Sequence, residues 1–179
     1  MDSLAGQEVG RLKDDGNAHF KAGDLDNALF CYSEGIKLSA GLKQNKDEEL
    51  TAVLYRNRAA VYLKREQFVE AEADCTSALQ FDMDDTKALY RRALSREALG
   101  NVGEAFKDAK MAIRKEPKNA ALLQLMERLV KANAKKHEEA LSTENRVKDM
   151  IKLAFESREE NKFGQSWVGD AEKRVQVGR

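Results

Sequence analysis

The sequence predicts an all-α protein of three helical hairpins, each a helix, a turn and a second helix, closed by a capping helix. The small residues Ala71 and Ala78 recur 34 positions later as Ala105 and Ala112. The same column occurs 43 positions before Ala71, at Ala28, which is one repeat plus a nine-residue insertion. Because small residues at fixed positions let helices approach closely, this spacing predicts a repeated packing scheme.

Periodicity and turn residues support the hairpins. In the second half of the first unit, apolar residues recur at steps of three and four, as on one stripe of an α-helix: Leu25, Ala28, Leu29, Tyr32 and Ile36. Gly23 and Gly100 supply turns in the first and third units, whereas the turn near Glu66 has no glycine. Each unit is therefore predicted to be helix, turn, helix.

These signals set the expected boundaries. Residues 1–8 are expected to form an N-terminal tail and 9–137 the repeat domain, with repeats at about 9–42, 52–85 and 86–119 and the insertion around 41–47. Pro117 disfavours continuation of the third unit's last helix through Glu116, and Asn119 is a candidate N-cap for the capping helix, 119–137. The apolar stripe expected to cover the last hairpin contains Leu122, Leu123, Met126, Leu129 and Val130.

The region 138–179 is predicted to begin a new helix at Ser142-Thr143-Glu144. Its apolar stripe consists of Val147, Met150, Ile151, Ala154 and Phe155. Two interpretations stay open: a linker helix that folds back on the capping helix, or the start of a truncated, armadillo-like helical domain. The segment 161–179, with the single Trp167, has little periodicity and no assigned role.

Composition excludes several functions. With 31 basic and 31 acidic residues the formal net charge is zero, so no nucleic acid or acidic membrane surface is expected as a partner. The sequence has no apolar run long enough to span a bilayer and no signal pattern at its N-terminus, which predicts a cytoplasmic protein. Cys31 and Cys75 are expected to be buried small hydrophobes. No phosphate loop, metal spacing or catalytic constellation occurs, so we expect a non-enzyme without cofactor or metal.

Five polar side chains fall on the predicted first helices of the units. Lys13 and Asn17 are four residues apart in the first unit, Asn57 lies in the second, and Lys87 and Arg91 are four apart in the third. Asn57 and Arg91 share one column of the repeat, so the five are expected to converge on one groove. Lysine and arginine donate charge-assisted hydrogen bonds to carboxylates, and an asparagine amide both donates and accepts. The set predicts capture of a dianionic peptide end, an α-carboxylate beside an aspartate side chain.

A 34-residue helical hairpin with small residues at its eighth and twentieth positions resembles the tetratricopeptide repeat, over roughly residues 9–119 plus the capping helix. The resemblance implies a right-handed superhelical solenoid. The five polar residues look like the dicarboxylate clamp of tetratricopeptide co-chaperones, which hold the C-terminal Glu-Glu-Val-Asp of heat-shock protein 90 and cytosolic heat-shock protein 70. It also implies secondary peptide contacts at Phe20, Lys21, Val53, Ala60, Lys64 and Leu94.

The early start of the repeats and the strings around Asn57 and Lys87 are similar to the Unc-forty-five type of UCS myosin chaperones. That similarity implies recruitment of heat-shock protein 90 to myosin, which a C-terminal domain outside this sequence would hold. Two alternatives stay open. The chain is a targeting module of a larger chaperone-associated enzyme, such as a phosphatase, isomerase or ubiquitin ligase, or it is a general protein-protein scaffold.

Overall fold

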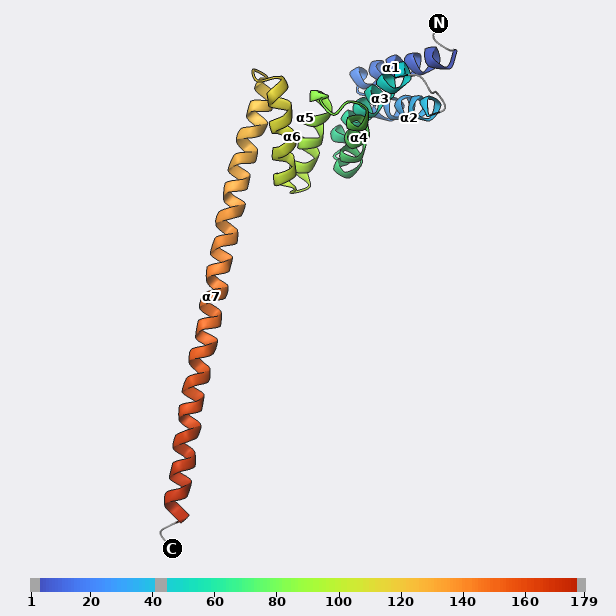
Figure 1. Cartoon of the computed structure of the whole chain (residues 1–179). Helices are drawn as coiled ribbons and strands as arrows, with labels where there is room; N and C mark the ends of the chain where they lie inside the picture. Colours follow the sequence, from blue (N-terminus) through green and yellow to red (C-terminus); the bar gives the residue numbers. More distant parts are fainter. Residues whose placement is uncertain (1–3, 41–44, 177–179) are drawn as a thin grey trace. The chain divides into compact units, whose positions relative to one another are not determined.

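The computed structural model describes the backbone of residues 4–40 and 45–176 and the side chains of residues 4–40, 48–136 and 138–150. Within these ranges every regular element is an α-helix (Figure 1): α1 (Leu4–Ala22), α2 (Leu25–Ser39), α3 (Asn45–Lys64), α4 (Phe68–Phe81), α5 (Thr86–Ala98), α6 (Val102–Lys115) and α7 (Ala120–Gln176). The chain divides into two compact units, Met1–Asn133 and Ala134–Arg179. The first unit contains all the hairpins.

The hairpins are α1 with α2, α3 with α4, and α5 with α6. Contacts of α2 with α3 and of α4 with α5 join successive hairpins, and the first helices α1, α3 and α5 also contact one another in sequence order. The predicted all-α repeat fold is therefore confirmed. Since α1, α3 and α5 are neighbours, side chains on their shared face are placed close together.

The three hairpin turns occupy one column of the repeat. Gly23 and Gly100 have φ angles of 81° and 78°, and Glu66, at the same position of the second hairpin, has a φ of 58°. Left-handed backbone costs a residue with a Cβ about 1–2 kcal/mol, which glycine avoids. The middle turn keeps the geometry without a glycine and is therefore strained.

Small residues provide the close approaches that the repeat predicts. Ala28, Ala71 and Ala105 are fully buried. A Cβ on Gly16 would lie 2.6 Å from Cε1 of Tyr32, so this glycine is required for α1 to pack on α2. The expected packing role of these positions is confirmed, and the notch at Gly16 sets where the Tyr32 ring lies.

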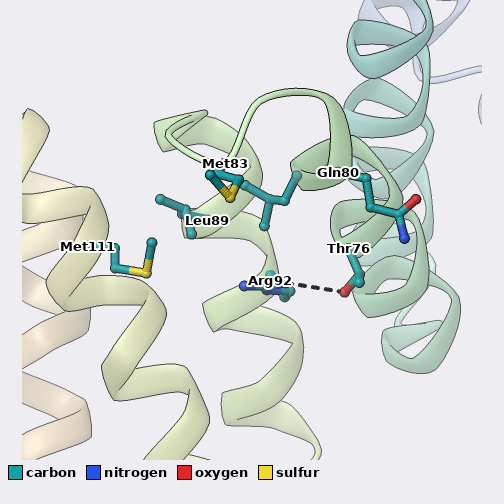
Figure 2. Close-up of a pocket in the computed structure, with 7 residues that line it drawn as sticks. Thr76, Gln80, Met83, Leu89, Arg92 and Met111 are labelled. Carbon is teal, nitrogen blue, oxygen red and sulfur yellow. Dashed lines mark hydrogen bonds between the residues drawn. The ribbon is translucent and has the colours of Figure 1, made fainter. Parts of the chain in front are cut away.

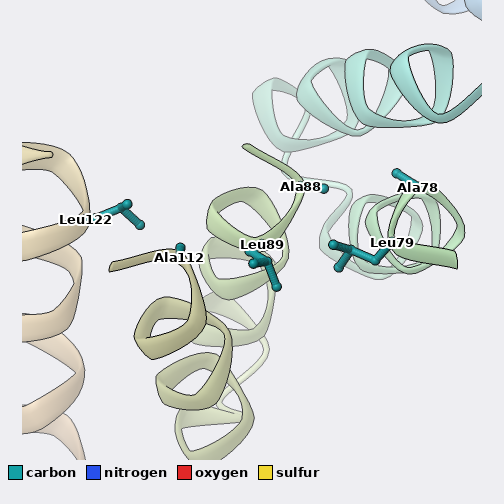
Figure 3. Packing of buried hydrophobic residues seen from close by; sticks show 6 residues of the cluster. All are labelled: Ala78, Leu79, Ala88, Leu89, Ala112 and Leu122. Carbon is teal, nitrogen blue, oxygen red and sulfur yellow. The ribbon is translucent and has the colours of Figure 1, made fainter. Parts of the chain in front are cut away.

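The capping helix closes the third hairpin at the start of α7. The Oδ1 atom of Asn119 accepts hydrogen bonds from the backbone N–H groups of Ala121 (3.1 Å) and Leu122 (3.3 Å), as expected for an N-cap. Leu122 packs in a cluster with Leu89 and Ala112, shown in Figure 3. Burial of a leucine side chain contributes about 1.5–3 kcal/mol, so this helix is firmly docked.

The predicted stripe of the capping helix is partly wrong. Leu122, Leu125 and Leu129 are at most 1% exposed, whereas Leu123 and Val130 are about half exposed. Leu125, absent from the predicted stripe, packs with Ala105 and Ala109. The residue after a buried position is rotated by about 100° around the helix axis, which turns Leu123 and Val130 away from α6.

The predicted N-terminal tail and the insertion also need correction. Residues from Leu4 onward are helical, and Val9 is fully buried in a cluster that includes Leu54. Helix α3 begins at Asn45, seven residues before the predicted start of the second repeat, and Leu50 packs against the same cluster. Residues 41–44 of the insertion lie outside the described residues. The additional turns of α3 thus place Leu50 against this cluster, whereas Leu4 in the additional turn of α1 is 86% exposed.

The expected helix start at Ser142-Thr143-Glu144 is wrong, because α7 continues through it. The Thr143 hydroxyl donates to the backbone carbonyl of Glu139 (2.8 Å), which satisfies it inside a helix. Val147 and Met150 are exposed. The side chains of Ile151, Ala154 and Phe155 and of the 161–179 tail lie outside the described residues, so a further domain starting near 138 stays a prediction.

Cys31 and Cys75 are buried free thiols, as predicted. Burial raises the pKa of Cys75 to about 12, which keeps it a neutral apolar group. Among the helices that the structure describes, none combines the length and apolar character needed to cross a membrane.

Candidate functional site

The two predicted asparagines meet between α1 and α3. The Asn17 Oδ1 atom accepts two hydrogen bonds, one from the Tyr32 hydroxyl (2.8 Å) and one from Nδ2 of Asn57 (3.0 Å). Burial raises the pKa of Tyr32 to about 12, so its hydroxyl remains a donor at neutral pH. Since the Asn17 oxygen is occupied by both donors, its Nδ2 group is directed elsewhere and is available to an acceptor.

Arg91 is partly buried on α5 and forms no ion pair with the described side chains. Its Nη1 atom donates to the backbone carbonyl of Arg56, and it has no carboxylate partner among the residues whose side chains are described. Burial lowers the pKa of Arg91, and the nearby Arg56 charge acts in the same direction. A guanidinium has five N–H donors, so most of the hydrogen-bonding capacity of Arg91 is unused.

The other arginines of α3 and α5 differ in this respect. Arg58 forms a two-bond ion pair with Asp74 (2.7 and 2.8 Å), and Arg92 repeats it with Asp108 (2.9 and 2.7 Å) one repeat later. Arg56 pairs with Asp85, and Arg96 with Glu72 and Asp108. The sequence analysis did not predict these ion pairs. Two of them could have been predicted, because an arginine is followed 16 residues later by an aspartate in two successive repeats, at Arg58 and at Arg92. Arg91 is the arginine of these two helices that has no carboxylate partner among the described residues.

Lys87 and Arg91 line a pocket of about 280 Å³ between α5 and the start of α7. The α5–α7 pocket is completed by Tyr90 and Thr86 of α5 and by Glu116, Asn119, Ala121 and Leu122. The Lys87 side chain is exposed, and within the described part of the chain it forms no ion pair. The capping helix therefore contributes to the predicted site, which the sequence did not indicate.

Lys13 forms an ion pair within its own helix, α1. Its side chain is 28% exposed, and its Nζ atom lies 3.1 Å from Oδ1 of Asp14. An ion pair with a largely exposed partner contributes at most about 1 kcal/mol, so an incoming carboxylate can replace Asp14. No hydrogen bond or ion pair between described side chains joins Lys13 to the other four.

The structure thus links four of the five predicted residues in two groups. Asn17 and Asn57 are directly bonded, and Lys87 and Arg91 share the α5–α7 pocket, whereas Lys13 belongs to neither group. The buried Tyr32 lies near both groups, because its hydroxyl donates to Asn17 and burial raises its pKa against the lowering effect of the Arg91 charge. Tyr32 was predicted only as a member of an apolar stripe. Its role depends on a contact across 15 residues that no local pattern reveals.

The structure brings two of the six predicted secondary contacts together. The Lys64 ammonium lies 4.4 Å from the centre of the Phe20 ring, a cation–π contact between α3 and α1. Val53 and Ala60 are partly buried on α3, Lys21 is exposed, and Leu94 packs with Ala93 against the core. Phe20 and Lys64 are therefore in direct contact, whereas Leu94 is a partly buried residue at the edge of the core cluster.

A second pocket of about 280 Å³ lies between α4, α5 and α6 (Figure 2). Its lining is mostly apolar, with Met83, Leu89 and Met111 among its residues. Its one cation, Arg92, donates to Thr76 and is already paired with Asp108. This pocket offers no unpaired charge to a carboxylate, which distinguishes it from the α5–α7 pocket.

Several known proteins are similar to this chain in sequence. No protein-family model matches the chain. Protein unc-45 homolog B of Danio rerio is 40% identical over 145 residues, 81% of this chain and 15% of that protein. The Homo sapiens protein of the same name is 37% identical over 157 residues, 88% of this chain and 16% of that protein. The chain therefore spans about a sixth of the length of these relatives.

Two solved structures are similar in fold. The myosin chaperone UNC-45 from C. elegans, in complex with an Hsp90 peptide, aligns with a TM-score of 0.69 and 46% identity over 82% of this chain and 16% of that chain. The first TPR domain of Spaghetti (RPAP3), bound to the Hsp90 peptide SRMEEVD, aligns with a TM-score of 0.64 and 33% identity over 72% of this chain and 94% of that chain.

The fold is that of a helical-repeat domain of the tetratricopeptide type. The chain belongs to the tetratricopeptide repeat family and is homologous to the corresponding region of the UNC-45 proteins, as the repeat spacing and the strings around Asn57 and Lys87 predicted.

Proposed function

We propose that this chain is a non-enzymatic co-chaperone adaptor that binds the C-terminal Glu-Glu-Val-Asp peptide of heat-shock protein 90, and that of heat-shock protein 70 with the same residues. The peptide-binding residues are Lys13, Asn17, Asn57, Lys87 and Arg91, with secondary contacts from Phe20, Lys21, Val53, Ala60, Lys64 and Leu94. Relatives of the same family are described with bound Hsp90 and Hsp70 peptides, which supports this ligand class.

The observation that carries the proposal is the partly buried guanidinium of Arg91, which has no carboxylate partner among the described residues. It donates to the backbone of Arg56, directly before Asn57 of the bonded Asn17–Asn57 pair. Two cations in the α5–α7 pocket suit one carboxylate, and the amide donors with Lys13 suit a second. Charge-assisted hydrogen bonds contribute roughly 1.5–3 kcal/mol each, and ordering the peptide offsets much of this. The expected affinity is about −8 kcal/mol, in the micromolar range, and it weakens as salt rises.

The larger role follows from the relatives. We propose that the chain recruits the heat-shock protein to a myosin client in the cytoplasm, because the similar C. elegans protein is described as a myosin chaperone. The client-binding region would lie outside the residues compared, since the chain matches about a sixth of that protein.

Calorimetry with two peptides tests the clamp. The free-acid peptide is expected to bind wild type, whereas the C-terminally amidated peptide and the Arg91→Ala variant lose most of the affinity with helical circular dichroism unchanged. Lys107→Ala is the control, because it removes an exposed cation that pairs with Glu104 on α6. Equal binding of both peptides would show that the chain end is not recognised and would favour a scaffold that binds internal segments.

A further inference from the structure

Arg56 precedes Asn57 on α3 and contacts α5 at two points. Its Nη1 atom donates to Oδ2 of Asp85, and its backbone carbonyl accepts from Nη1 of Arg91. The Arg56 side chain is 20% exposed and that of Asp85 is 7% exposed, so the ion pair is largely withdrawn from water. One residue of α3 therefore holds both the beginning and the middle of α5.

Asp85 is also the N-cap of α5. Its Oδ1 atom accepts from the backbone N–H groups of Lys87 (2.9 Å) and Ala88 (3.0 Å), while Oδ2 pairs with Arg56. A single carboxylate thus fixes the first turn of α5 and attaches that turn to α3. Because Lys87 lies in this turn and Arg91 one turn later, the attachment determines where both cations lie relative to Asn57.

We propose that Arg56 and Asp85 are positioning residues, which hold Lys87 and Arg91 in register with Asn57 and do not contact the ligand. This inference rests on the proposed function. Arg56 adds a cation near the site, but it forms an ion pair with Asp85, whereas Arg91 forms none with a carboxylate of the described residues. Its Nε atom is buried without an acceptor among the described residues, so Arg56 depends on Asp85 as its charge partner.

The direction in which one substitution changes the peptide affinity separates a positioning residue from a residue that contacts the ligand. Asp85→Asn keeps an oxygen that can cap α5 but removes the charge partner of Arg56. If Arg56 bound the peptide directly, its release from Asp85 would strengthen binding. If it positions α5, the same substitution weakens binding.

Calorimetry with the free-acid Glu-Glu-Val-Asp peptide at a temperature where every variant is folded gives the binding test. Arg56→Met and Asp85→Asn are each expected to raise Kd about fivefold, and the double variant also about fivefold, because contacting groups are not additive. Arg56→Lys keeps the charge and is expected to recover most of the affinity. The matched control is Arg128→Gln, which breaks the two-bond pair of Arg128 with Glu97 at the other end of α5 and is expected to leave Kd unchanged.

The free protein gives an independent measurement. The Nε–Hε resonance of Arg91 is expected to shift in Arg56→Met and Asp85→Asn but not in Arg128→Gln. Tighter binding by Asp85→Asn, multiplicative losses in the double variant, or an unmoved Arg91 resonance would each overturn the positioning role. A wild type that binds no peptide while the resonance shifts as expected would refute the proposed function and leave the positioning role standing.

Discussion

The substitution Tyr32→Phe removes one buried oxygen from beneath the predicted clamp. Tyr32 is 1% exposed, and its hydroxyl donates to Oδ1 of Asn17 at 2.8 Å. Asn17 keeps the second bond, from Asn57 at 3.0 Å, so no buried acceptor is left unsatisfied. The cost in free energy of unfolding is therefore that of one neutral hydrogen bond, about 1 kcal/mol.

The effect on binding follows from the amide of Asn17. With two donors on its oxygen the amide is held in one orientation, and with one donor it is held less firmly. A loss of up to about 1 kcal/mol corresponds to a Kd about fivefold higher for the free-acid peptide. The melting temperature is expected to fall by about 2–4 °C for a chain of this size.

Calorimetry at a temperature where both proteins are folded measures this change. The control is Tyr62→Phe, since the Tyr62 hydroxyl has no hydrogen-bond partner among the described residues and its ring contact with Arg58 is kept. If Tyr32→Phe lowers the melting temperature but leaves Kd equal to that of wild type, the hydroxyl supports only the fold and the argument for a fixed amide is refuted.

Two further predictions concern stability. Glu66→Gly is expected to raise the free energy of unfolding by about 1 kcal/mol, because Glu66 has a φ of 58°. Gly100→Ala, at the same position of the third repeat, is expected to lower it. Urea unfolding measures both changes, and a Glu66→Gly variant less stable than wild type would contradict the strain at Glu66. Burial raises the pKa of Tyr32 from 10.0 and of Cys75 from 9.0, each to about 12. Both pKa values are raised in the folded state, so the unfolded chain loses these protons at lower pH than the folded chain does. The contribution of the two groups to the free energy of unfolding is therefore complete below about pH 9 and is lost as the pH rises to about 12. Urea unfolding at pH 7 and at about pH 11 should show this loss, and a smaller one in Tyr32→Phe; equal losses would contradict the shift.

Much of the fold could be predicted because its determinants are local or periodic. The spacing of Ala71 and Ala105 and the glycines at positions 23 and 100 predicted the hairpins, and Asn119 predicted the start of the capping helix. The errors concern the N-terminal tail, the insertion, the apolar stripe of the capping helix and the helix start at Ser142, which lies inside α7. Leu4 to Glu8 have no strong helical pattern, yet they extend the helix in front of Val9. Val9 is buried in a cluster with Leu54, a contact that the sequence does not display.

The sequence by itself determined the repeat, the helices that carry each predicted binding residue, and the kinds of group presented to a ligand. These follow from side-chain chemistry and the helical period. Only the tertiary structure decided which cations are free. Arg56, Arg58, Arg91 and Arg92 look alike in sequence, but three have carboxylate partners from other helices and Arg91 has none among the described residues. Pairing depends on which helices pack together, so the charge available to a ligand is a property of the folded chain.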